Sequence, residues 1–90
     1  MSKIRDCVKS QVRFIYNSIA ELNAYNPYRT KESDLKRIDM TESRCYMLRD
    51  ICEALRNDGL LNDDEYMEIV QKSTSALHTL TRKRNEVIAQ

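Results

Sequence analysis

The chain has 90 residues with only one glycine and one proline, 41% hydrophobic and 32% charged residues, and a formal net charge of +1. Because glycine and proline form most sharp turns, this composition predicts an all-α protein. It also excludes glycine-rich nucleotide loops and the glycine-flanked nucleophile of many hydrolases. A net charge near zero argues against a protein that coats a polyanion. No apolar run approaches the roughly 20 residues of a membrane span and the N-terminus lacks a secretory signal, so we expect a cytoplasmic protein without a membrane partner.

The first expected helix covers about residues 2–25, with Ser2 as its N-cap. Its apolar positions follow one another in steps of four and three: Val8, Val12, Ile15, Ile19 and Leu22. This spacing places them on one face of the helix. Pro27 disfavours helical geometry at Asn26 and should end the helix there.

Residues 26–39 are polar and contain no sustained apolar stripe, so we expect a connector that carries a short helix near residues 31–38, capped by Thr30 or Ser33. A second main helix is expected over residues 41–57, with Thr41 as its N-cap. Its apolar seam consists of Cys45, Leu48, Cys52 and Leu55. Gly59 should supply the left-handed residue that ends this helix.

The third expected helix covers about residues 62–88 and has the clearest start signal in the chain. Asn62 is the expected N-cap and Glu65 its capping-box partner three residues later. The short link before it predicts that the last two helices form an antiparallel hairpin. One Phe and no Trp make a thin core for a single domain of residues 1–90, so we expect the bundle to form a homodimer.

The cysteines and the single histidine give little support for catalysis or metal binding. Cys7, Cys45 and Cys52 lie in apolar patterns at spacings that do not suit zinc, which favours buried, reduced thiols. His78 has no evident partner for acid–base or nucleophilic chemistry, and we expect it at the surface. The sequence therefore predicts a non-enzymatic protein with no catalytic residue, no cofactor and no metal.

The residues that we expect to contact a protein partner lie off the apolar seams. They are Tyr25, Tyr28, Arg29, Tyr46, Asp63, Asp64 and Glu68. Tyrosine suits interfaces because its rigid ring carries both apolar area and a hydroxyl, and an acidic cluster suits a basic partner. The alternatives are packing at the core edge for the tyrosines and helix capping for the acidic residues.

Nucleic acid is the alternative class of partner. Arg5, Lys9 and Arg13 recur every four residues, and Arg82, Lys83 and Arg84 form a second basic cluster. The alternatives are a solvated helix face for the first set and stabilisation of a helix C-terminus for the second. A helix-turn-helix reader is disfavoured because the N-terminus of its second helix would bring acidic residues to the phosphates.

With catalysis and loop-based ligand sites disfavoured, the remaining functional surface is helix surface and one polar connector. We therefore expect a small module that binds another protein stoichiometrically as an adaptor, regulator or inhibitor. A phage or mobile-element protein that occludes a host enzyme or defence complex is one form that such a module takes. The alternative is a helical protein that associates with nucleic acid through the basic stripe of its first helix.

Overall fold

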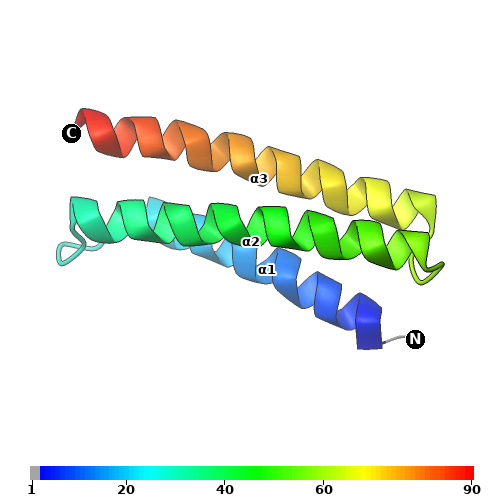
Figure 1. The fold of residues 1–90 in the computed structure, drawn as a ribbon. Helices are drawn as coiled ribbons and strands as arrows, with labels where there is room; N and C mark the ends of the chain where they lie inside the picture. The colour runs from blue at the N-terminus through cyan, green and yellow to red at the C-terminus, as the bar shows by residue number, and fades with distance from the viewer. Residues whose placement is uncertain (1–2) are drawn as a thin grey trace.

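The computed structural model describes residues 3–90, and this part of the chain forms three helices: α1 (Lys3–Asn23), α2 (Lys31–Asn57) and α3 (Asp63–Ala89). Figure 1 shows α2 and α3 side by side and antiparallel, with α1 crossing them at an angle. The bundle is elongated, with extents of 45 × 20 × 16 Å. The all-α class and the antiparallel hairpin of the last two helices are confirmed.

The core lies along the line where the three helices meet. It contains most of the predicted seam positions; its fully buried members include Ile15, Leu22, Ile38, Cys45, Cys52, Leu80 and Val87. Val12, Ile19 and Leu55 are half-buried against them. The steps of four and three therefore identified the packed faces of α1 and of the second half of α2.

The helix α1 ends at Asn23, two residues before the expected end at about Tyr25. At this end, Nη1 of Arg29 donates to the carbonyls of Glu21 and Ala24. The helix ends before Asn26, the residue whose helical geometry Pro27 disfavours. The predicted N-cap, Ser2, lies outside the described residues.

The prediction of a short helix followed by a separate main helix is wrong, because residues 31–57 form one continuous helix. Thr30 is the N-cap of this helix and forms a capping box with Ser33. Thr30 was one of the two residues predicted to cap the short helix. Thr41 is an interior residue: it is buried, and its hydroxyl donates to the Arg37 carbonyl at 2.7 Å. Burial of Ile38 and Thr41 extends the core face towards the N-terminus, so the connector shrinks from 26–39 to 24–30.

The turn between α2 and α3 follows the predicted chemistry. Gly59 has a φ of 77°, and the amides of Gly59 and Leu60 donate to the carbonyls of Arg56 and Leu55. These two bonds form a Schellman motif, which requires a residue in the left-handed backbone conformation. Glycine adopts this conformation without strain. The helix α2 therefore ends here because of its local sequence.

The start of α3 is also confirmed. The Asn62 side chain accepts from the Glu65 amide at 2.8 Å, and the Glu65 carboxylate accepts from the Asn62 amide at 3.0 Å. The bond from the Asn62 backbone, assisted by Arg5, holds the pKa of Glu65 below its usual value. Two orphan amides of the helix start are thus satisfied reciprocally.

The cysteines divide into two groups. Cys45 and Cys52 are buried as predicted, and burial raises the pKa of both thiols, that of Cys45 to about 11. The prediction that Cys7 is buried is wrong, because this thiol is exposed. Cys7 directly precedes Val8, and successive residues of a helix point about 100° apart, so only Val8 reaches the core.

Candidate functional site

The residues predicted to contact a protein partner lie in three separate places. Tyr25 and Tyr28 are 91% and 90% exposed in the connector between α1 and α2, and Tyr46 is exposed on α2. Asp63, Asp64 and Glu68 are exposed at the start of α3, at the opposite end of the bundle. The helix α2 that separates these ends is about 40 Å long. The predicted residues therefore do not form one surface.

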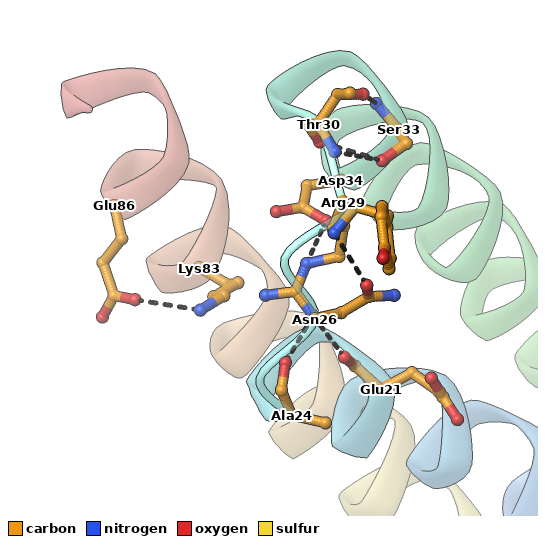
Figure 2. A network of polar contacts seen from close by, with 10 residues as sticks. Glu21, Ala24, Asn26, Arg29, Thr30, Ser33, Asp34, Lys83 and Glu86 are labelled. Carbon is orange, nitrogen blue, oxygen red and sulfur yellow. Dashed lines mark hydrogen bonds and ion pairs between the residues drawn. The ribbon is translucent and has the colours of Figure 1, made fainter.

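Arg29 joins the end of α1 to the start of α2 (Figure 2). Its Nη1 donates to the carbonyls of Glu21 at 2.6 Å and Ala24 at 2.7 Å, and its Nε lies 2.7 Å from Oδ1 of Asp34. The Asp34 side chain is only 10% exposed. Arg29 thus has an intramolecular role that its position in a polar segment did not reveal, and its contact with a partner stays a prediction.

The first set of basic residues lies beside a groove between α1 and α3, which we call the α1/α3 groove. Arg5, Lys9 and Arg13 line it from α1, and Glu65, Glu68 and Lys72 line it from α3. Arg5 pairs with Glu65 at 2.6 Å, and Glu68 pairs with Lys72. Because carboxylates stand opposite the basic stripe, a phosphate backbone would meet mixed charge here.

The second basic cluster is also engaged in ion pairs. Arg84 pairs with Asp39 at 2.6 Å and with Glu42, and both carboxylates raise the pKa of its guanidinium. Lys83 pairs with Glu86 at 3.7 Å (Figure 2), while Arg82 is exposed. Arg84 lies about 28 Å along α3 from Glu65, the partner of Arg5. The two basic sets therefore form no continuous patch.

A larger groove, of about 620 Å³, lies between α1 and α2. We call it the α1/α2 groove. Its apolar side chains are Phe14 from α1 and Met40 and Met47 from α2, which are 43%, 58% and 56% exposed. Tyr28 and Arg29 of the connector lie at one end of it. The groove thus includes two of the predicted partner-binding residues and joins them to a surface that the sequence did not reveal.

Arg44 crosses the α1/α2 groove and connects its two walls. Its guanidinium carbon lies 4.5 Å from the centre of the Phe14 ring, and its Nη1 donates to Oε1 of Gln11 at 3.0 Å. A cation over an aromatic face is attracted by the ring quadrupole, so Arg44 is held in one orientation. The groove therefore combines flexible methionines with one fixed guanidinium.

One signal in the sequence pointed to this groove. Met40 and Met47 are seven residues apart, which places them on the same side of one helix, away from the seam of Cys45, Leu48 and Cys52. The predicted helix start at Thr41 separated the two methionines. With α2 continuous from Lys31, their common side becomes apparent.

The chain matches no protein-family model, and no curated protein and no solved structure is significantly similar to it. Within residues 3–90, no helix has the length and apolar character that a membrane crossing requires. In the same part of the chain, no group of three or more His, Cys, Asp or Glu side chains could hold a metal ion. His78 is exposed, as predicted.

Proposed function

We propose that this chain is a non-enzymatic protein-binding module that acts stoichiometrically, as an adaptor, regulator or inhibitor in the cytoplasm. A protein that occludes a host enzyme or defence complex, as phage and mobile-element proteins do, is one form of this role. The supporting observation is the α1/α2 groove, where Phe14, Met40 and Met47 are each about half exposed. Covering the exposed halves of three such side chains is worth roughly 2–4 kcal/mol.

Nucleic-acid binding has weaker support. Arg5, Lys83 and Arg84 each pair with a carboxylate of the same chain, and phosphate contacts would have to compete with those pairs. The remaining exposed cations of the two basic sets are too few for more than weak, salt-sensitive binding. The protein-binding role is therefore the proposal that we carry forward.

The proposed module is tested by recovering its partner with a tagged protein from cells in which the chain occurs naturally. We expect native mass spectrometry to show a complex of fixed stoichiometry. The double variant Met40→Glu/Met47→Glu should lose at least nine-tenths of the partner, because it replaces two apolar contacts of the groove with charges that a bound partner would cover. The control variant Met67→Glu/Ile88→Glu changes two exposed apolar residues of α3. This control should recover as much of the partner as the wild type does.

Circular dichroism should show equal helix content for both double variants. Equal recovery of the partner by the groove variant and by the wild type would show that the groove is not the docking surface. Absence of any complex of fixed stoichiometry would contradict the proposed function itself.

We also propose that the protein forms a homodimer. The support is its small core together with apolar side chains outside both grooves, of which Ile51 and Leu60 are about half exposed. Light scattering on the purified protein should give twice the mass of one chain. A single-chain mass at micromolar concentration would contradict the dimer and leave the protein-binding module unaffected.

A further inference from the structure

We infer that the α1/α2 groove binds an acidic amphipathic helix of a partner protein. This inference rests on the proposed function and specifies the chemistry of the partner. It is carried by three features of the groove: its charge, the spacing of its side chains and the fixed position of Arg44.

The groove has an excess of positive charge in a chain that is nearly neutral overall. Its charged side chains are Glu21, Arg29, Asp34, Lys36, Arg37 and Arg44. Arg29 and Asp34 pair with each other, so Lys36, Arg37 and Arg44 face a partner against the single charge of Glu21. Complementary charge on a partner increases the association rate and disfavours basic competitors.

The spacing of the groove side chains matches a helix. Met40 and Met47 are seven residues apart along α2, and so are Arg37 and Arg44. Seven residues correspond to about 10.5 Å, or two helical turns. A partner helix that lies along the groove can therefore place two apolar side chains on the methionines and two carboxylates on the arginines at the same repeat.

The groove combines one oriented cation, Arg44, that can bind a carboxylate with flexible methionine side chains that can fit different apolar groups. Stacking on Phe14 and the bond to Gln11 hold the Arg44 guanidinium in place, and the fork of Arg has further N–H donors for a carboxylate. Because Arg44 is already oriented, less side-chain entropy is lost when it binds. The methionines have flexible thioether chains that fit apolar residues of different shapes.

A helix is a better occupant than an extended peptide. Residues 3–90 contain no β-strand, so these residues offer no sheet edge to which an extended segment could add by backbone hydrogen bonds. A helix satisfies its own backbone groups and presents only side chains to the groove. The partner segment is therefore expected to bind through one apolar face flanked by Asp or Glu.

The inference is tested with three fluorescein-labelled peptides of about 20 residues. The first is an acidic amphipathic helix with Leu at positions i, i+4 and i+7 and Glu beside them. The second has Lys in place of every Glu, and the third has the composition of the first in a scrambled order without an apolar face. Fluorescence anisotropy at about 50 mM salt should show micromolar binding of the acidic helix and at least tenfold weaker binding of the other two.

Two charge-matched variants locate the binding site. Arg37→Glu/Arg44→Glu should weaken binding of the acidic helix at least tenfold. The same variant should bind the Lys peptide more tightly than it binds the acidic helix. Lys72→Glu/Arg82→Glu makes the same change in net charge outside the groove and should alter the affinity less than threefold. Circular dichroism confirms that both variants keep the helix content of the wild type.

The following results of these measurements would overturn the inference. Equal binding of the scrambled acidic peptide would indicate general attraction between charges, and stronger binding of the Lys peptide would give the groove the opposite preference. A homodimer that Met40→Glu/Met47→Glu dissociates would identify a second copy of this chain as the occupant. If a cellular partner requires the methionines and the acidic helix does not bind, this inference fails while the proposed function stands.

Discussion

Replacing Glu42 with proline is expected to destabilise the protein by about 3 kcal/mol more than replacing it with alanine. Glu42 lies in the interior of α2, eleven residues after its first residue, Lys31. A proline there removes a backbone hydrogen bond and places its ring against the carbonyl of Ile38, which belongs to the preceding turn. Because domains of this size are stable by only about 5–13 kcal/mol, a loss of this size is readily measured by urea denaturation.

The alanine variant is the necessary control, since Glu42 also pairs with Arg84 and both replacements remove that pair. A second control is proline at Lys31, the first residue of α2. Thr30 before it has φ −107° and ψ 161°, which is the geometry that proline prefers in the preceding residue. Lys31→Pro should therefore differ from Lys31→Ala by less than 1 kcal/mol. If proline is tolerated equally at 42 and 31, a helix start at Thr41 is correct and the continuous α2 is wrong.

The start of α3 and the turn before it could be predicted because their signals are local. Asn62 and Glu65 satisfy each other within one helical turn, and Gly59 adopts the left-handed geometry at the only glycine of the chain. No contact with another helix is needed to recognise such signals. The capping of α2 by Thr30 is of the same kind.

The continuity of α2 could not be predicted in this way. The segment before Thr41 is polar, and its core face comprises only a few residues, among them Asp34 and Ile38. Burial of Asp34 depends on its pair with Arg29, which comes from outside the helix. Thr41 resembles an N-cap by residue type, but packing places it inside the bundle, where its hydroxyl donates to a carbonyl one turn earlier.

The α1/α2 groove depends on how α1 is oriented, which the sequence does not specify. Phe14 flanks the apolar stripe of α1 and is 43% exposed, and Figure 1 shows that α1 crosses α2 and α3 at an angle. The Phe14 ring lies under the guanidinium of Arg44 from α2. The periodicity of the sequence predicts which face of α1 is apolar. The groove forms at the edge of that face, where no neighbouring helix covers it, and the periodicity does not predict this edge.

Replacing Arg29 with alanine is expected to destabilise the protein by about 2–3 kcal/mol. The guanidinium satisfies two carbonyls at the end of α1 and pairs with the nearly buried Asp34 at the start of α2. Its removal leaves the Asp34 charge without its partner in a place that water reaches poorly, and it leaves the end of α1 uncapped. Urea denaturation should show a lower midpoint with an unchanged slope.

The double-mutant cycle with Asp34→Ala separates these two effects. If the ion pair carries much of the loss, Asp34→Ala in the Arg29→Ala background should cost at least 1 kcal/mol less than in the wild type. Arg29→Lys should recover less than half of the loss, because one ammonium cannot serve two carbonyls and a carboxylate on opposite sides. An Arg29→Ala variant within 0.5 kcal/mol of the wild type would show that the connector does not hold α1 to α2. Arg29 would then be available to contact a partner, which is the role that the sequence alone predicts for it.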